Sequence, residues 1–313
     1  MRWGMLILAA ASVADAAAAQ PVVAGQDQSV AAQRAETRFA PPLGVAQRFR
    51  LTITKRGQTH SWIEEVRFER DGNAYVAHWR MDPASLPPAM KHPLLAPMIR
   101  PFTGAPVAFA LDDEGSVGGV RDWATQQARL LKSIDDSRPL LLAASGADKN
   151  EAETVLAATR AMFQQLDAQS GADIILKNLA PVFGWGGYGL TLNQPVMGTE
   201  TVPIAWLGTS LDRLSTITLT ALEPGIARIT LRSEFEGTAM RKMLDQLRAK
   251  VIDADPAAKA RSARSMGQLD QMRAVQSTHV AIDLATGLPR RVEADVAADG
   301  KIGQRTIIEW LKP

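Results

Sequence analysis

The sequence contains no cysteine among its 313 residues. Such a chain can form neither a disulfide nor a thiolate metal site, and it cannot use a thiol as a nucleophile. Aromatic residues make up only 5% of the chain, so the core must be built largely from leucine, valine, isoleucine and alanine. The composition, 46% hydrophobic and 22% charged, is that of a globular protein long enough to bury a core without disulfides.

Neither sign of charge dominates the sequence. Lysine and arginine number 35 against 33 acidic residues, a formal net charge of +2. Nucleic-acid binding requires clustered basic surface, so we expect no nucleic-acid partner. Beyond the N-terminal region no segment is apolar over the roughly 20 residues that a bilayer crossing needs, which predicts no transmembrane segment in the mature chain.

The N-terminal stretch MRWGMLILAAASVADAAAAQ has the pattern of a secretory signal peptide. A basic residue near the start precedes an apolar run from Met5 to Val13, and small residues follow. We predict a signal peptide over residues 1–19, cut after Ala19, and hence a periplasmic or extracellular protein. Residues 20–37 are polar and aperiodic, which predicts a flexible leader.

Apolar residues alternate with polar ones on both sides of a helical middle. Alternating stretches separated by tight-turn signals occupy residues 39–120 and 190–313. Residues 121–183 instead carry apolar residues at helical spacing behind N-capping residues. We therefore predict a single α+β domain over residues 38–313. Its large twisted, mainly antiparallel sheet would consist of two similar halves, half-barrel-like in outline and packed against the helices of the middle.

The second half also contains a predicted helix over residues 240–251. Two strand–turn–strand stretches, residues 66–80 and 217–232, resemble each other, as a duplication of the two halves would predict. In outline the arrangement is similar to the half-barrel of periplasmic lipoprotein-carrier proteins, whose curved sheet holds acyl chains against helices. This likeness is one of architecture without a shared motif, and a fold alone does not fix a function.

The stretch HVAIDLATGLPRRVEADV raises the question whether Asp283 is a catalytic carboxylate or the corner of a hairpin. The hairpin is favoured, because Gly287 supplies the positive φ that a tight turn needs and alternating residues flank it. These alternating residues are Val280, Ile282 and Leu284 before the turn, and Val292, Ala294 and Val296 after it.

The sequence shows no motif for a catalytic or metal site. The four histidines, His60, His78, His92 and His279, include no pair at the spacing of a helical zinc site. No nucleophile elbow or phosphate-binding loop is present. Glu64 and Glu65 are neighbours on a predicted strand, so they point to opposite faces and make a poor acid/base pair. We predict no catalytic residue, metal or cofactor, although a triad assembled from distant residues stays open.

Two segments are candidates for ligand contact. The proline-rich stretch 83–106 predicts either a loop folded over the core or a lid over an apolar cavity. Its candidate ligand-binding residues are Met90, Leu94, Leu95, Met98, Ile99 and Phe102. The glycine-rich stretch FGWGGYG, residues 183–189, predicts a crossing between the helical middle and the second half, or a ligand contact through Trp185 and Tyr188.

These observations favour a non-enzymatic protein of the cell envelope that binds a hydrophobic or lipid-like ligand between sheet and helices. The alternative is an envelope module for protein–protein interaction or assembly, which would use an exposed sheet face or edge. A third hypothesis is a secreted hydrolase whose site is assembled from distant residues.

Overall fold

The computed structural model confirms the α+β fold and the antiparallel sheet. It describes residues 33–145, 149–204, 209–235, 274–298 and 301–311. The predicted signal peptide, most of the predicted leader and the predicted helix over 240–251 lie outside these ranges. Among the described residues, no helix combines the length and the apolarity that a bilayer crossing requires.

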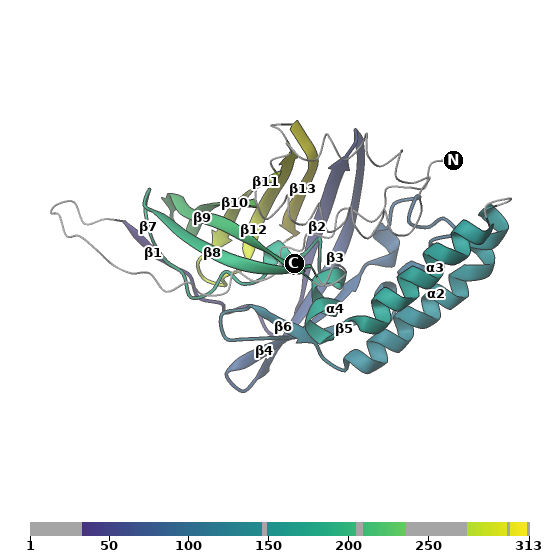
Figure 1. Ribbon diagram of the computed structural model, residues 1–313. Coiled ribbons are helices and arrows are strands. Elements are labelled where there is room, and N and C mark those ends of the chain that lie inside the picture. The colour runs from purple at the N-terminus through teal and green to yellow at the C-terminus, as the bar shows by residue number, and fades with distance from the viewer. Residues whose placement is uncertain (1–32, 146–148, 205–208, 236–273, 299–300, 312–313) are drawn as a thin grey trace.

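Eleven antiparallel strands form the main sheet (Figure 1). Its first half consists of β2 (Ala46–Lys55), β3 (Gln58–Asp71), β4 (Ala74–Met81), β5 (Val107–Leu111) and β6 (Val117–Val120). Its second half consists of β8 (Pro195–Ile204), β9 (Thr209–Glu223), β10 (Ile226–Phe235), β11 (Ala274–Asp283), β12 (Pro289–Ala298) and β13 (Lys301–Leu311). A separate two-stranded sheet pairs β1 (Arg34–Glu36) with β7 (Gly189–Thr191).

The two halves meet in the middle of the sheet. The strand order is β6-β5-β4-β3-β2-β13-β12-β11-β10-β9-β8, so β2 of the first half pairs with β13 of the second. The indole of Trp310 donates a hydrogen bond to the amide oxygen of Gln47 across this seam, at 3.2 Å and 263 residues apart in sequence. Each half is a meander, as the alternation pattern predicted.

The helical middle contains α2 (Trp123–Ser145), α3 (Lys149–Gln165) and α4 (Ala168–Ile175), followed by the short 3₁₀ helix η2 (Ala180–Val182). The proline-rich stretch contributes η1 (Pro83–Ser85) and α1 (Ala96–Thr103). Helix α4 packs on β6 and α1 on β4, whereas α2 packs on α1 and pairs with α3. The α2–α3 hairpin projects to one side of the sheet (Figure 1).

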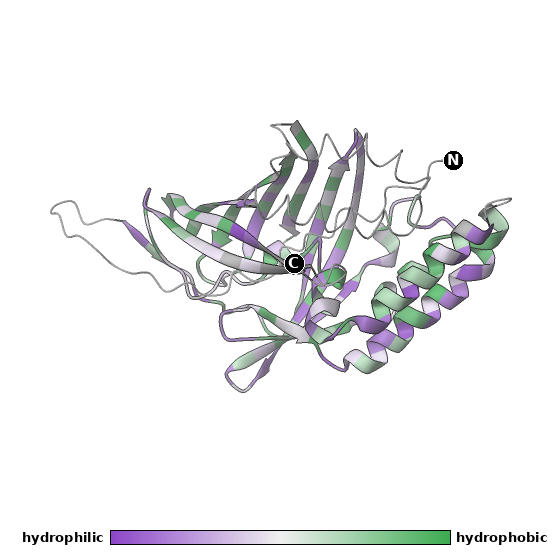
Figure 2. Ribbon diagram, in the orientation of Figure 1, coloured by the Kyte–Doolittle hydropathy of each residue, from purple (hydrophilic) through white to green (hydrophobic). Residues whose placement is uncertain are grey.

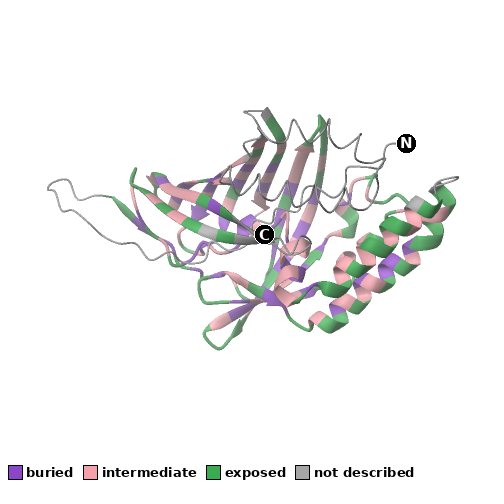
Figure 3. Cartoon of the chain, in the orientation of Figure 1, coloured by how far each residue is buried: buried purple, intermediate pink, exposed green. Residues whose placement is uncertain are grey.

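The core lies on one face of the sheet, called here the inner face. Seven buried side chains from seven neighbouring strands stand in one row across it: Leu219, Ile229, Val280, Val292, Ile308, Leu51 and Trp62. Buried residues of the α4–η2 region, Leu176, Leu179 and Val182, belong to the same core. Apolar and polar residues alternate along the strands (Figure 2), and the buried positions follow the apolar ones (Figure 3).

Strands β1 and β8 have no clear signal in the sequence, whereas helix α1 has one in the position of its prolines. Arg34–Glu36, within the predicted leader, forms β1 because it pairs with β7, more than 150 residues away. Strand β8 contains Pro195 and Pro203, and it lies at an edge of the sheet, where a residue without an amide hydrogen is tolerated. Helix α1 begins at Ala96 and places Pro97 in its first turn.

Candidate functional site

A buried carboxyl group lies in the core beneath the proline-rich stretch. Alternation on β3 places Glu64 on the inner face between Trp62 and Val66, and Glu64 is only 3% exposed. The indole of Trp62 donates a hydrogen bond to Oε1 at 2.8 Å, and the indole of Trp79 donates one to Oε2 at 2.6 Å. Both oxygens of this carboxyl therefore accept hydrogen bonds from neutral donors inside the core.

Burial raises the pKa of Glu64 to about 7, from an ordinary value of 4.5. Removal from water disfavours the charged form, and this effect outweighs the two indole hydrogen bonds, which lower the pKa. Among the described residues no cationic side chain is hydrogen-bonded to Glu64. The core thus holds a carboxyl group that changes its charge near neutral pH.

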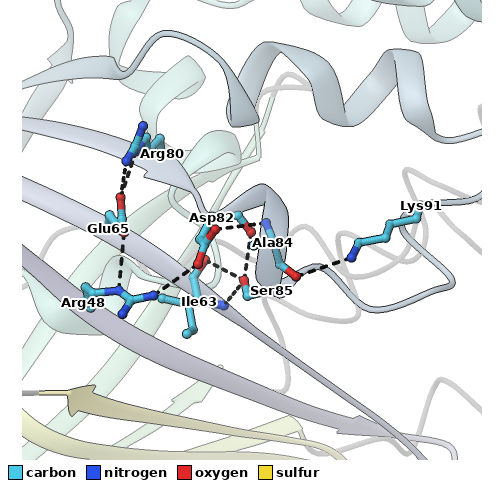
Figure 4. A network of polar contacts seen from close by, with 8 residues as sticks. All are labelled: Arg48, Ile63, Glu65, Arg80, Asp82, Ala84, Ser85 and Lys91. Atoms are coloured by element: carbon cyan, nitrogen blue, oxygen red, sulfur yellow. Dashed lines mark hydrogen bonds and ion pairs between the residues drawn. The ribbon is translucent and has the colours of Figure 1, made fainter.

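The proline-rich stretch leaves the sheet directly beside this carboxyl. In the sheet register Glu64 faces Met81, the last residue of β4. The hydroxyl of Ser85 accepts a hydrogen bond from the Ile63 amide at 2.8 Å and donates one to the Asp82 carbonyl at 2.8 Å (Figure 4). The start of the stretch is therefore fixed to β3 one residue away from Glu64.

The opposite face of β3 carries charges that are paired at the surface. Glu65 forms ion pairs with Arg80 at 2.6 Å and with Arg48 at 3.3 Å, and Arg48 also contacts Asp82 at 3.2 Å (Figure 4). The prediction that Glu64 and Glu65 point to opposite faces is confirmed. The two carboxyl groups do not form an acid/base couple. Glu64 is the more unusual of the two, because it is buried without an ion pair in the described ranges.

The candidate ligand residues of the proline-rich stretch have different environments. Met90, Ile99 and Phe102 pack against the core, and the ring of Phe102 lies 5.7 Å from that of Trp79. Leu94 is half-buried, whereas Leu95 and Met98 are exposed. The stretch therefore covers the Trp79 end of the carboxyl site with some of its apolar side chains and presents others to solvent.

The two candidate residues of the glycine-rich stretch lie elsewhere. Trp185 is buried, and its indole donates to the Pro181 carbonyl at 2.7 Å. Its ring lies 6.2 Å from that of Tyr188. Tyr188 lines a polar cavity of about 460 Å³, together with Arg34 and Tyr75. None of the candidate residues of the proline-rich stretch lines this cavity.

The inner face becomes polar toward one end of the strands. Beyond the apolar row, the next row contains both apolar and hydroxyl side chains: Ile217, Leu231, Thr278, Ala294, Thr306 and Ile53. The row after it, called here the rim, is mostly polar: Ser215, Ser233, Gln276, Val296 and Gln304. Val296 of the rim is 42% exposed. Ser233 of the same row is buried, at 5% exposure. The face thus changes from apolar to polar toward this end of the strands, and it is exposed at Val296.

Two lysines stand at the end of the rim. Lys55 faces Gln304 in the register and lies on the inner side of β2, where it is exposed. Lys177, just after α4, is half-buried, and its pKa is lowered by burial and by the nearby charge of Lys55. Neither lysine has an ion-pair partner in the described part of the chain. The rim therefore ends in positive charge that no carboxylate of the described residues pairs.

Asp283 is the corner of a hairpin, as the sequence pattern predicted. Its carboxylate accepts a hydrogen bond from the Ala285 amide at 3.0 Å and two from the Arg290 guanidinium at 2.9 and 2.6 Å. Gly287 has a φ of 71°. The backbone of Arg38 and Phe39 occupies the space that a side chain at Gly287 would need. Asp283 thus holds together the β11–β12 turn.

Three histidines make local contacts. His78 lies 3.2 Å from a carboxylate oxygen of Glu69, and His279 lies 3.1 Å from the hydroxyl of Thr230. The ring of His92 accepts a hydrogen bond from the Leu94 amide at 3.3 Å. Within the described ranges no group of three or more histidine, aspartate and glutamate side chains is arranged to hold a metal ion.

No protein-family model matches the chain, and no curated protein and no solved structure is significantly similar to it.

Proposed function

We propose that the protein is a non-enzymatic binding protein of the cell envelope that holds a lipid-like, amphipathic ligand on the inner face of its sheet. The observation that carries this proposal is the gradient along that face, from the buried apolar row to the polar rim, which is exposed at Val296. An amphipathic molecule gains free energy by placing its apolar part against apolar surface and its polar end against hydrogen-bonding groups.

The charge at the rim favours an anionic ligand. Lys55 and Lys177 repel each other, and an anionic head group between them would relieve this repulsion. The hydroxyl and amide side chains of the rim can donate the remaining hydrogen bonds. A fatty acid or an anionic phospholipid has this combination of an apolar chain and a negative end.

The proposed location in the envelope rests on the N-terminal sequence. Residues 1–19 have the order of basic, apolar and small residues that directs secretion. Proteins of this compartment meet free lipid and lipid surfaces, which fits a protein that binds amphipathic molecules.

Replacing Val296 by glutamate should weaken ligand binding. Val296 belongs to the rim and is accessible, so the substitution puts a negative charge on the proposed binding surface without disturbing the core. We expect the dissociation constant of a fluorescent long-chain fatty acid to rise about tenfold or more, equivalent to a loss of roughly 1.4 kcal/mol. Fluorescence titration of the purified protein, stripped of bound lipid by organic extraction and refolded, measures this constant.

Leu214→Glu provides the matched control. Leu214 is 40% exposed, nearly as much as Val296, but alternation on β9 places it on the outer face. This variant should bind the fatty acid as the parent protein does. Absence of saturable binding by the parent protein, or an equal effect of both substitutions, would contradict the proposed function.

A further inference from the structure

The polar cavity of about 460 Å³ lies at the opposite end of β3 from the rim. It is open to solvent and is lined by four segments: β1 with the residues after it, the tip of the β3–β4 hairpin, the β5–β6 turn and the glycine-rich stretch. The Thr37 amide donates to the Tyr188 carbonyl at 2.9 Å, and the Gly186 amide donates to the Glu114 carbonyl at 3.0 Å. The hydroxyl of Tyr75 donates to the Phe39 carbonyl at 3.0 Å. The walls are thus fixed by hydrogen bonds between distant segments.

The glycines of this stretch allow charged groups to approach the backbone. A side chain at Gly187, which has a φ of 77°, would collide with the Glu114 carboxylate. A side chain at Gly189 would come within 2.5 Å of the Arg34 guanidinium. The glycine-rich stretch therefore makes room for one acidic and one basic group at the cavity wall.

The charged side chains that line the cavity balance in number but are not ion-paired in the described part of the chain. Three arginines, Arg34, Arg38 and Arg70, and three acidic residues, Glu36, Asp113 and Glu114, contribute to the lining. None of these six forms an ion pair within the described ranges. Most other arginines of the same ranges do form ion pairs with carboxylates: Arg48, Arg50, Arg67, Arg80, Arg121, Arg138, Arg160, Arg228, Arg232, Arg290, Arg291 and Arg305.

One of the three guanidinium groups is held in place while its outer nitrogens are left available. The guanidinium carbon of Arg70 lies 4.5 Å from the centroid of the Tyr75 ring, and its Nε donates to the Gly72 carbonyl at 3.1 Å. Arg70 is exposed, and a stacked guanidinium whose terminal nitrogens have no hydrogen-bond partner in the described ranges is suited to two parallel hydrogen bonds with a phosphate or carboxylate. Asp113 and Glu114 follow each other on one turn and give the cavity an acidic corner.

We propose that this cavity binds a zwitterionic ligand in which a phosphate group stands a few bonds from an ammonium group. The arginines would take the phosphate, and the acidic corner would take the ammonium. A simple anion fits less well, because the six charged side chains of the lining sum to zero and the carboxylates would repel it. This chemistry occurs in free phosphoethanolamine and in the head group of phosphatidylethanolamine. The proposal is independent of ligand binding at the rim.

Isothermal titration calorimetry on the purified protein with O-phosphoethanolamine and with inorganic phosphate tests the site. We expect phosphoethanolamine to bind at least tenfold more tightly than phosphate, and Arg34→Gln to weaken its binding about tenfold. Arg100→Gln is the matched control, since Arg100 is an exposed arginine on α1 that has no ion pair in the described ranges and lies outside the cavity. Thermal unfolding of both variants verifies that they are folded.

Sedimentation with vesicles identifies the source of the ligand. Vesicles of phosphatidylcholine with and without phosphatidylethanolamine are compared for the parent protein and Arg34→Gln. If the protein sediments only with vesicles that contain phosphatidylethanolamine, and only when Arg34 is present, the ligand is a lipid head group. If free phosphoethanolamine binds in an Arg34-dependent way but the vesicles do not, the ligand is a soluble molecule. The proposal is overturned if neither form binds in an Arg34-dependent way, or if phosphate alone binds as tightly. Val296→Glu should leave phosphoethanolamine binding unchanged. A failure of this proposal can therefore be told apart from a failure of the proposed function at the rim.

Discussion

Glu64→Gln should remove most of a pH dependence in the stability of this protein. The folded-state pKa of Glu64, about 7, lies above the ordinary value of 4.5 that applies to the unfolded chain. Between these values the folded state binds more protons than the unfolded state. The free energy of unfolding of the parent protein should therefore fall as the pH rises from about 4.5 through 7.

The size of this effect follows from the difference in pKa. Each unit is worth about 1.4 kcal/mol, so ionisation of Glu64 should cost the folded state roughly 3 kcal/mol by pH 8. Glutamine cannot ionise, so this loss should be absent in the variant. Its single side-chain oxygen leaves one of the two indole donors without its carboxyl partner, which should lower stability by about 1–2 kcal/mol at acidic pH.

Urea unfolding at a series of pH values between 4 and 8, followed by tryptophan fluorescence, measures both effects. Glu65→Gln is the control, because Glu65 is adjacent in sequence but lies on the outer face in surface ion pairs. This control should keep the downward trend of the parent protein with rising pH. A Glu64→Gln variant with the same pH trend as the parent would show that Glu64 does not titrate in this range.

Gly287→Ala should destabilise the protein much more than Gly225→Ala. Both glycines have a positive φ, 71° and 75°, so alanine costs about 1–2 kcal/mol at either position through its backbone conformation. At Gly225 nothing lies within 4 Å of the added methyl group. At Gly287 the methyl group would overlap the carbonyl group of Arg38 and lie 2.9 Å from Cα of Phe39.

The added cost at Gly287 is that of forcing two packed backbone segments apart, which is typically about 1–3 kcal/mol. The displaced segment leads directly to Phe39, whose buried ring packs edge-on against Phe68 and Tyr75. Equilibrium unfolding in urea at one pH gives the two losses of stability for direct comparison. Equal losses would mean that the segment at Arg38 moves away from the turn without cost.

Local pattern was sufficient to predict most of the sheet. The alternation in β9 and β10 and the turn between them can all be read from one continuous stretch of sequence. This is because the two strands that pair are neighbours in the chain. Strand β8 has two prolines and no regular alternation, so its place was set by pairing with β9 rather than by its own pattern. The pairing of β1 with β7 joins segments that no local signal connects.

The buried carboxyl of Glu64 has a signal in the sequence. Alternation on β3 already placed Glu64 on the same face as Trp62, Val66 and Phe68, and a glutamate on an apolar face needs an explanation. Its second donor, Trp79, could not be assigned, because that contact depends on how β4 pairs with β3. The polar cavity draws on four separate segments, so only the folded chain brings its charges together.

The seam between β2 and β13 pairs the first and the last strand of the main sheet in the sequence. If the order of the strands is followed from β8 to β13 and then from β2 to β6, every step joins neighbours in the sheet, and the helices connect the two outer edges. Each half can pair its own strands locally, but the centre of the sheet requires Gln47 and Trp310 to meet across 263 residues. Contacts between residues so far apart in sequence form slowly, so we expect the two meanders to form early and to join late in folding. Until they join, β2 and β13 are unpaired edge strands.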